Sequence, residues 1–393
     1  MNSMRFLCSA AVPLLAATLA PAAHAQMRAD SAALVTVLGR DTLALERWVQ
    51  QPGRITAEAV VRSPRTTLRR YVAELADDGM MTAFEEHTYL PSAPDEPVRS
   101  ETWVRAGEGW TRTLTEGDST RASQVSGPAA ALPFVDLVHW PFNLVVARAP
   151  GQGGTQPLFS GGRMMNFTVA PAGAGAWTLT HPMRGPSVAR VDASGRMVSL
   201  DAAGTTRKVV VTRVPWLGNE MQAAAARWEA ADRAGRGMGE LSGRGREEET
   251  LSGARIVIDY GQPVRRGRDI FPAVVRWGQL WRTGANRATH LTTDRALVLG
   301  EGANTLRVPA GEYTLFSMPA EDGGVLIVNR QTGQNGTSYD AARDVGRVPM
   351  RREAIAAPVE TFTIDVVPGA AGAGTLRLSW DRTAFVIPVR VEP

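Results

Sequence analysis

Apolar and polar residues alternate at period two along much of the chain between residues 34 and 215, and polar or glycine-containing breaks separate the alternating runs. In one run every second residue is apolar, namely Ile55, Ala57, Ala59 and Val61. Because successive side chains of a strand point to opposite faces, this pattern predicts strands with one buried and one polar face. Antiparallel strands of this kind pack one face against a core.

The breaks between the runs predict hairpin turns. Asp77-Asp78-Gly79 separates two alternating runs, and a glycine there favours a hairpin because it adopts positive φ at little cost. Comparable breaks occur at residues 106–109, 192–195 and 202–204. Residues 27–217 are therefore predicted to form an antiparallel meander of about ten strands, as a curved sheet or open half-barrel.

One apolar segment, residues 129–147, interrupts the meander and carries Phe134, Trp140 and Phe142. One interpretation is a short helix or lid across the concave face of the sheet, with an amphiphile held beneath these three aromatic residues. The other is a segment that caps an ordinary core. In architecture alone the layout is similar to the half-barrel of periplasmic lipoprotein carriers, which implies a lipid as the partner.

The composition changes after residue 217. Residues 219–236 are good helix formers, and the apolar positions share one face at helical spacing, namely Met221, Ala224, Ala225, Trp228 and Ala231. Residues 235–249 are rich in Gly, Arg and Glu and predict a flexible linker. The expected division is a helix and polar linker at 218–252, followed by a second domain at 253–393.

The second domain has eight or nine short apolar runs separated by turn residues, from residues 256–258 to residues 383–391. Gly369 to Gly374 is a glycine-alanine segment with no helix after it, so it predicts a hairpin loop and not a phosphate-binding loop. These features are typical of a β-sandwich or jelly roll. The expected fold class of the whole chain is all-β.

Six motifs of the second domain occur in the order found in one bacterial family. They are Tyr260 with Pro263, residues 267–271, residues 281–289, residues 309–315, residues 329–336, and Trp380-Asp381. Together they resemble the domain of unknown function 2911 family (DUF2911) over residues 254–391. Relative to that family, Pro272 replaces a usual glycine and Arg287 replaces a usual acidic residue. The resemblance implies no activity or cofactor.

The first 25 residues have the features of a secretory signal. Arg5 precedes an apolar run, and Ala23-His24-Ala25 matches the small-x-small pattern that signal peptidase cuts. We therefore expect a periplasmic or secreted protein. Cys8 is the only cysteine and lies inside this segment, so the processed chain would have no disulfide and no thiolate metal site. No later segment has the roughly 20 apolar residues of a membrane-spanning helix, and a spanning protein is not expected.

The charge pattern argues against a nucleic-acid partner. The formal net charge is only +4, and the basic residues are scattered among acidic ones. Lys208 is the only lysine, so every other residue in the total of 43 Lys and Arg is arginine. Arginine presents a planar guanidinium group that binds carboxylates and phosphates at two points. The alternation pattern predicts that Lys208 lies in a strand.

A cluster in the second domain is the candidate ligand site: Tyr260, Arg265, Arg268, Trp281, Arg282 and Asn286. Guanidinium groups bind anions and aromatic faces stack on sugars, so the cluster predicts a shallow site for an anionic or carbohydrate-like ligand. The alternative is a structural turn at residues 281–286, in which Gly284 adopts positive φ, Asn286 bonds backbone and Trp281 is mostly buried.

No recognisable catalytic motif occurs in the sequence. Its four histidines beyond the signal segment are not at metal-ligand spacing, and we assign no catalytic residue, metal or cofactor. The leading hypothesis is a non-catalytic binding or scaffold protein for an amphiphile or an anionic envelope component. The alternative is a hydrolase of envelope glycans or esters that uses the Arg/Trp/Asn cluster. It would need a carboxylate or histidine within hydrogen-bond reach of that cluster. The oligomeric state stays open.

Overall fold

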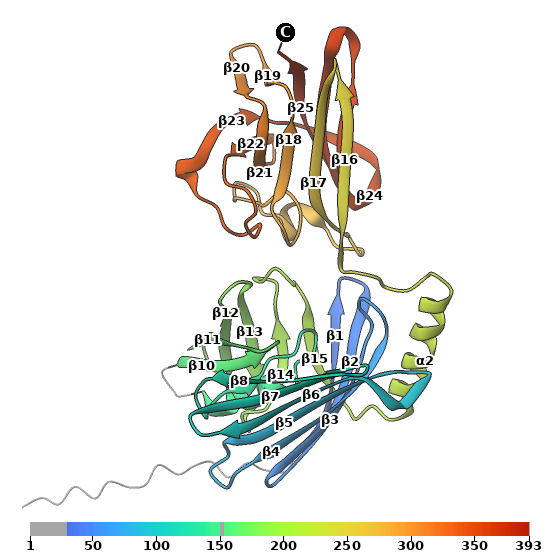
Figure 1. Cartoon of the computed structure of the whole chain (residues 1–393), viewed down its shortest axis with the longest axis vertical. Coiled ribbons are helices and arrows are strands. Elements are labelled where there is room, and N and C mark those ends of the chain that lie inside the picture. Colours follow the sequence, from blue (N-terminus) through green and yellow to red (C-terminus); the bar gives the residue numbers. More distant parts are fainter. Residues whose placement is uncertain (1–29, 150–152, 393) are drawn as a thin grey trace, which may run out of the picture.

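The structure is a computed structural model and describes residues 30–149 and 153–392. Two domains rich in β-strand lie one above the other along the longest axis of the molecule (Figure 1). This confirms the all-β fold class. The predicted signal segment, residues 1–25, lies outside the described residues. No helix in the described ranges is long and apolar enough to cross a membrane.

The N-terminal domain contains one large sheet and two helices, α1 (Pro141–Arg148) and α2 (Asn219–Arg233). Its strands are β1 (Asp30–Leu38), β2 (Asp41–Gln51), β3 (Arg54–Val61), β4 (Thr67–Leu75), β5 (Met81–Leu90), β6 (Ala93–Ala106), β7 (Gly109–Glu116), β8 (Ser119–Ser126), β9 (Leu132–Pro133), β10 (Gly154–Ser160), β11 (Arg163–Pro171), β12 (Ala176–His181), β13 (Gly185–Val191), β14 (Met197–Asp201) and β15 (Val210–Val214).

Two meanders make this sheet. Strands β1 to β8 follow one another in space, as do β10 to β15, and β1 pairs with β15 to join the two series. The strand order begins at β8 and ends at β9, so the sheet is open and not a closed barrel. The pairing is antiparallel throughout except at the two-residue strand β9, which runs parallel to β10. The predicted antiparallel meander is therefore confirmed, with more strands than expected.

Aromatic side chains cover much of the concave face of the sheet. Trp103 and Trp110 pack on Phe159, with ring centroids 4.5 and 5.1 Å away. Helix α1 contributes Phe142 and its neighbours to the same core, and Trp140 before it is also buried. Burial of these large rings contributes to the stability of this domain.

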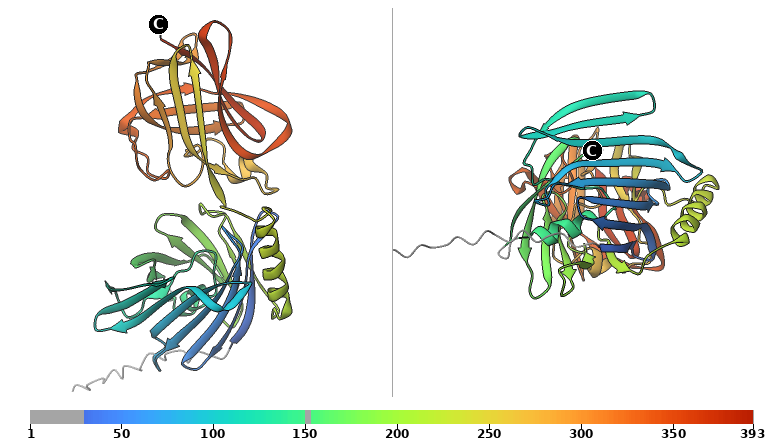
Figure 2. Two further views of the ribbon diagram at one scale, coloured as in Figure 1. Left: turned by 45° about the vertical axis from the view of Figure 1, so that its right-hand side comes forward. Right: turned by 90° about the horizontal axis from the view of Figure 1, so that it is seen from below.

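Helix α2 lies on the outside of the sheet, beside β2 and β3 (Figure 2). Its predicted apolar stripe is buried at Met221, Ala224, Ala225 and Trp228, whereas Ala231 is only half-buried. The stripe packs on the outward-facing Val60 and forms a small core separate from the concave interior. The apolar face that helical spacing gives to α2 thus packs on the outer face of the sheet.

The C-terminal domain is a sandwich of two sheets. The first has the order β16-β17-β18-β21-β22-β23, and the second has the order β20-β19-β25-β24. Apolar residues from both sheets make one core. The strands are β16 (Ser242–Leu251), β17 (Ala254–Pro263), β18 (Thr289–Thr293), β19 (Leu297–Glu301), β20 (Asn304–Val308), β21 (Gly311–Ala320), β22 (Gly323–Asn329), β23 (Asp344–Pro349), β24 (Arg351–Pro368) and β25 (Ala373–Val391), with short helical turns η1 (Ile270–Val274), η2 (Ala341–Arg343) and η3 (Ala370–Gly372).

The predicted flexible linker at residues 235–249 is wrong for its second half. Residues from Ser242 onward form β16, an edge strand that pairs with β17 along its whole length. The strand has no apolar alternation, because ion pairs stabilise its outer face in place of apolar contacts. Arg244 and Arg246 both donate hydrogen bonds to Asp259 on β17. The segment between α2 and β16 is therefore short, and the C-terminal domain begins near residue 242 instead of residue 253.

Candidate functional site

The two domains touch at the turn between β1 and β2. The Arg40 amide donates to the Arg266 carbonyl at 3.0 Å, and the Arg266 guanidinium donates to Asp41 at 2.8 Å. Gly39 has a φ of 60°, and a Cβ there would lie 2.2 Å from the Arg266 carbonyl oxygen. The close approach of the two backbones therefore requires glycine at this position. Arg266 also contacts Met238, in the segment where the chain crosses between the domains.

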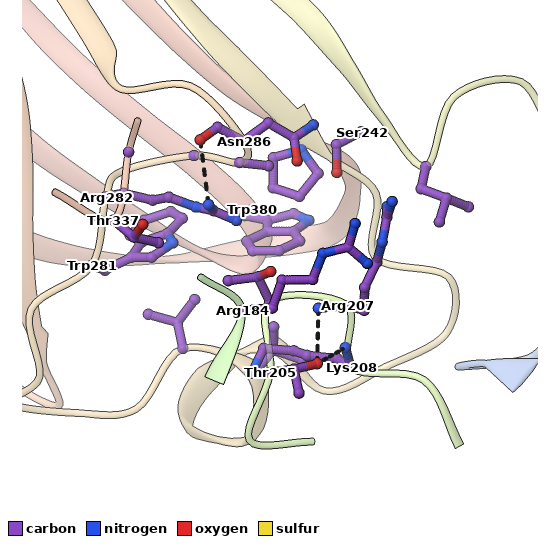
Figure 3. Close-up of a pocket in the computed structure, with 18 of the residues that line it drawn as sticks. Arg184, Thr205, Arg207, Lys208, Ser242, Trp281, Arg282, Asn286, Thr337 and Trp380 are labelled. Atoms are coloured by element: carbon purple, nitrogen blue, oxygen red, sulfur yellow. Dashed lines mark hydrogen bonds between the residues drawn. The ribbon is translucent and has the colours of Figure 1, made fainter. Parts of the chain in front are cut away.

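A cleft of about 370 Å³ lies between the domains and opens into a wider outer cavity of about 1280 Å³. The inner cleft has one wall from each domain, as Figure 3 shows. Its volume suits a small molecule. Its charged lining residues are Arg184, Arg207, Lys208, Arg268 and Arg282.

The N-terminal wall comes from two loops, one before β13 and one between β14 and β15. Arg184 donates to Asp136 at 2.7 Å, and Arg207 donates to the same carboxylate at 3.2 Å. Burial opposes the ionisation of Asp136, but Arg207 and Arg184 outweigh it and lower its pKa. Two guanidinium groups therefore share one carboxylate, which leaves a net positive charge at this wall.

Thr205 orders the loop that carries Arg207 and Lys208. Its hydroxyl accepts hydrogen bonds from the Arg207 and Lys208 amides, at 3.1 and 3.2 Å, and donates to the Ala202 carbonyl at 2.8 Å. Lys208 lies just before β15 with a φ of 54°, so the prediction that it belongs to a strand is wrong. Left-handed backbone is uncommon for lysine, and this hydroxyl supports it here.

The C-terminal wall is the segment from Trp281 to Thr289. The Trp281 and Ser317 backbones exchange hydrogen bonds of 2.7 and 2.9 Å, and the Thr283 hydroxyl bonds the Ser317 hydroxyl at 2.9 Å. Gly284 has a φ of 150°, as the turn interpretation predicted. A Cβ on Gly284 would lie 2.8 Å from the Gly261 carbonyl oxygen, so the segment is pressed against β17 and rigid.

Trp281 is half-buried, in contrast to the prediction that it is mostly buried. Its ring stacks on Trp380 with centroids 6.1 Å apart and meets Phe362 edge-on at 5.1 Å. The rest of the ring lines the cleft together with Trp380. Trp281 therefore belongs to the core and to the cleft at once, because the segment lies at the end of the sandwich that faces the other domain.

Arg282 has no acidic hydrogen-bond partner among the described residues. Burial lowers the pKa of its guanidinium, and its contact to the Asn286 carbonyl is long, at 3.4 Å. Burial, followed by the charge of Arg266, also lowers the pKa of Arg268, which donates to the Arg265 and Val264 carbonyls. Among the described residues that line the inner cleft there is no Asp, Glu or His.

The remaining predicted site residues have different positions. Asn286 is exposed with a φ of 62°, and its carbonyl, not its side chain, accepts a hydrogen bond from Gly336. The Tyr260 hydroxyl accepts from the buried Ile364 amide at 3.0 Å, so this side chain is structural although its residue borders the outer cavity. Arg265 forms an ion pair with Asp381 at 2.7 Å and does not line the cleft. The cleft thus unites Arg268, Trp281, Arg282 and Asn286.

The predicted lid residues lie in the N-terminal core. Trp140 is 1% exposed and Phe142 is 7% exposed, and Phe134 packs on Phe167 with centroids 5.5 Å apart. A cavity of only about 50 Å³ remains between Phe134, Phe142 and Phe167, and Arg184 and Arg207 border it. The interpretation that this segment caps a core agrees with this packing.

A buried carboxylate anchors the same segment. Glu46 on β2 is fully buried and accepts hydrogen bonds from the His139 and Trp140 amides at 2.7 and 2.9 Å. These amides lie at the N-terminus of α1, where a negative charge is favourable. The His139 ring nitrogen Nδ1 also lies 3.0 Å from the Thr36 hydroxyl. Within the described residues no group of His, Cys, Asp and Glu could hold a metal ion.

Sequence reasoning missed the N-terminal wall of the cleft. Arg184, Arg207 and Lys208 are 74 or more positions away from Arg282 in the sequence, and no local pattern connects them. The one sequence feature that could have indicated this wall is Lys208, because it is the only lysine of the chain.

Comparisons with known proteins support the domain boundary. Residues 242–389 match the family described as "Protein of unknown function (DUF2911)", which confirms the resemblance and begins at the first residue of β16. Among solved structures, the chain is similar to a DUF1089 family protein from Pseudomonas aeruginosa, crystallised at 1.80 Å resolution. The two are 13% identical, with a TM-score of 0.31, and the similarity covers 41% of this chain and 91% of that chain. No curated protein matches.

Proposed function

We propose that this protein binds a small anionic molecule in the cleft between its two domains. The observation that carries the proposal is the guanidinium of Arg282, which has no acidic hydrogen-bond partner among the described residues and lies at a wall that faces further cations. Removing a charged group from water is costly unless a charge of opposite sign pairs with it. A carboxylate or phosphate on the ligand would supply that partner in two-point geometry.

The aromatic residues of the cleft define the rest of the ligand. The half-buried Trp281 presents part of its ring to the cleft and packs on the buried Trp380, and the exposed Leu280 lies at the same cavity. A planar or apolar portion of the ligand would stack on this surface while its anionic group meets Arg282. Of the two ligand classes expected from the sequence, an anionic component fits the cleft better than an amphiphile fits the N-terminal interior, where the space beneath Phe134 and Phe142 is only about 50 Å³.

The other expectations enter this proposal in a limited way. A periplasmic or secreted binding protein remains the proposed setting, on the strength of the first 25 residues. The hydrolase alternative required a carboxylate or histidine near Arg268 and Arg282. The described lining of the inner cleft supplies neither. The outer cavity, which Arg282 also lines, contains Asp136, His181 and His290, but the hydrogen bonds of Arg268 and Arg282 go to backbone carbonyls.

Isothermal titration calorimetry with lactate, citrate and inorganic phosphate tests the proposal. We expect at least one of these anions to bind, and Arg282→Gln to weaken its binding about tenfold or more, as loss of a charge-assisted hydrogen bond predicts. Arg121→Gln is the matched control, because Arg121 is exposed on the edge strand β8 and does not line the cleft. Equal losses in both variants, or no binding of any of the three anions, would overturn the proposal.

A further inference from the structure

Lys208 differs chemically from the arginines of the chain. It is the only lysine. A guanidinium group stays protonated at any physiological pH, whereas a lysine ammonium group can lose its proton and become a nucleophile. The single residue with this capacity lines the cleft between the domains.

The local structure holds the Lys208 amine at the cleft wall. The Thr205 hydroxyl fixes the backbone of Lys208 in its left-handed conformation. The side-chain amine Nζ donates to the Ala203 carbonyl at 3.0 Å. A neutral amine retains a proton for this bond and still has a free lone pair, so deprotonation does not disrupt the arrangement.

Burial and nearby positive charges make it easier for the Lys208 amine to lose its proton. Burial lowers the pKa of Lys208, and the charges of Arg276, Arg268 and Arg282 on the C-terminal domain lower it further. On its own domain, Arg184 and Arg207 line the same cleft, and Asp136 is already bonded to both of them. Each unit by which a lysine pKa falls increases the fraction of free amine at neutral pH about tenfold.

We propose that Lys208 reacts with the carbonyl group of an oxo acid held in the cleft and forms an imine with it. This inference rests on the proposed anion-binding function, because the cleft arginines would hold the carboxylate of the oxo acid. The amine nitrogen attacks the carbonyl carbon, and a C=N bond replaces the C=O bond. The carbonyl oxygen leaves as water with the two protons of the amine, so the step needs no oxidant or reductant.

The ligand class follows from two kinds of group that line the cleft, guanidinium groups and one amine. Guanidinium groups recognise a carboxylate, and an unprotonated amine recognises an electrophilic carbonyl carbon. A small oxo acid carries both groups one bond apart. Binding the carboxylate would hold the carbonyl near Lys208 and increase the reaction rate through proximity.

Borohydride trapping on the full chain tests the proposal with three probes. Pyruvate has both a carboxylate and a carbonyl group, acetone has only the carbonyl, and lactate has only the carboxylate. With pyruvate and sodium cyanoborohydride we expect a reduced adduct that peptide mass mapping places on Lys208. Labelling by acetone should be slower by about tenfold or more, because nothing anchors it. Lactate should compete with pyruvate.

Lys208→Arg is the matched variant, because it retains the positive charge and removes the nucleophile. We expect it to give no adduct at position 208, whereas Arg121→Gln, outside the cleft, should form the adduct at the rate of the unchanged protein. Lys208→Met provides a second non-nucleophilic variant that should also fold, since Lys208 is only half-buried.

If lactate binds and pyruvate leaves no adduct on Lys208, the imine is overturned and the anion-binding function stands. Equal labelling by pyruvate and acetone would overturn the role of the arginines in the reaction. If neither lactate nor pyruvate binds and no adduct forms, both proposals fail for this ligand class.

Discussion

The interior of the N-terminal domain and the cleft between the domains both contain charged and aromatic side chains, but they differ in how charge is compensated. In the interior, Glu46 accepts two backbone amides, and Glu101 is bonded by Arg112 and by the Trp103 ring nitrogen. In the cleft, Arg184 and Arg207 share the carboxylate of Asp136, but the hydrogen bonds of the other three basic side chains, those of Lys208, Arg268 and Arg282, go to backbone carbonyls. Charge in the interior is paired within the chain, whereas the proposed anionic ligand would pair with the charges in the cleft.

The largest expected effect concerns the two tryptophans that differ in burial. Trp103 is 1% exposed and stacks on Phe159, so Trp103→Ala should cost about 3–5 kcal/mol of unfolding free energy. Trp281 is half-buried, so Trp281→Ala should cost about 2 kcal/mol, and it should also weaken ligand binding. Urea denaturation measures both losses. Equal losses would contradict the assignment of Trp281 to the cleft.

The next effect concerns the carboxylate that anchors α1. Glu46→Ala would leave two buried amides without acceptors, which should cost about 3 kcal/mol. Glu74→Ala is the control, since Glu74 pairs with Arg54 near the surface and such pairs contribute about 1 kcal/mol or less. A Glu46 variant as stable as the Glu74 variant would show that α1 is held by apolar packing alone.

The same substitution at two arginines should change stability in opposite directions. Arg112→Met removes a partner of the buried Glu101 and should lower the melting temperature. Arg282→Met replaces a half-buried charge that has no acidic hydrogen-bond partner with an apolar side chain, and it should raise the melting temperature of the ligand-free protein. Differential scanning fluorimetry without added anions measures both shifts. A lower melting temperature for Arg282→Met would mean that its charge already has a partner within the chain.

The smallest effect is a difference in pH dependence between two facing carboxylates. Burial raises the pKa of Glu86 above its ordinary value of 4.5, because Arg69 and Arg99 offset it only in part. The stability from Glu86 is therefore fully present below about pH 4.5 and is lost as pH rises through the folded pKa. Glu86→Gln should then stabilise the protein at pH 7 and have little effect at pH 4.

Glu101, directly opposite on β6, should behave in the reverse way. Burial opposes its ionisation, but the hydrogen bond from Arg112 and the charge of Arg99 outweigh burial and lower its pKa. Its stability is present above about pH 4.5 and is lost as pH falls through the folded pKa. Glu101→Gln should destabilise the protein at pH 7. Denaturation curves across this pH range distinguish the two residues, and parallel curves would contradict the assigned pKa directions.

The parts of the fold that local pattern controls were predictable from the sequence. Period-two alternation indicated the meander, and helical spacing indicated the stripe with Met221 and Trp228. Strand β16 was not predictable in this way, because ion pairs to Asp259 hold its surface where apolar alternation is usual. The half-burial of Trp281 depends on where the end of the sandwich meets another domain, which no local pattern contains.

For the site, the sequence indicated one wall and missed the other. Arg268, Trp281 and Arg282 lie close together in the chain, so their clustering was visible. Arg184 and Arg207 reach the same cleft only because two distant loops are brought to one end of the N-terminal sheet. Such a juxtaposition is a property of the tertiary structure and not of residue spacing.

The contact of the Gly39 turn with Arg266 has a mechanical consequence. Arg266 also touches Met238, in the segment that connects the two domains. This connecting segment and the contact between Gly39 and Arg266 therefore lie on the same side of the molecule. A rotation about that side would widen or narrow the mouth of the cleft without breaking either junction. We therefore expect a decrease in the radius of gyration on ligand binding, measurable by small-angle X-ray scattering, and an unchanged radius would rule out the rotation. Ligand entry and release would then depend on one hinge angle, the angle between the two domains.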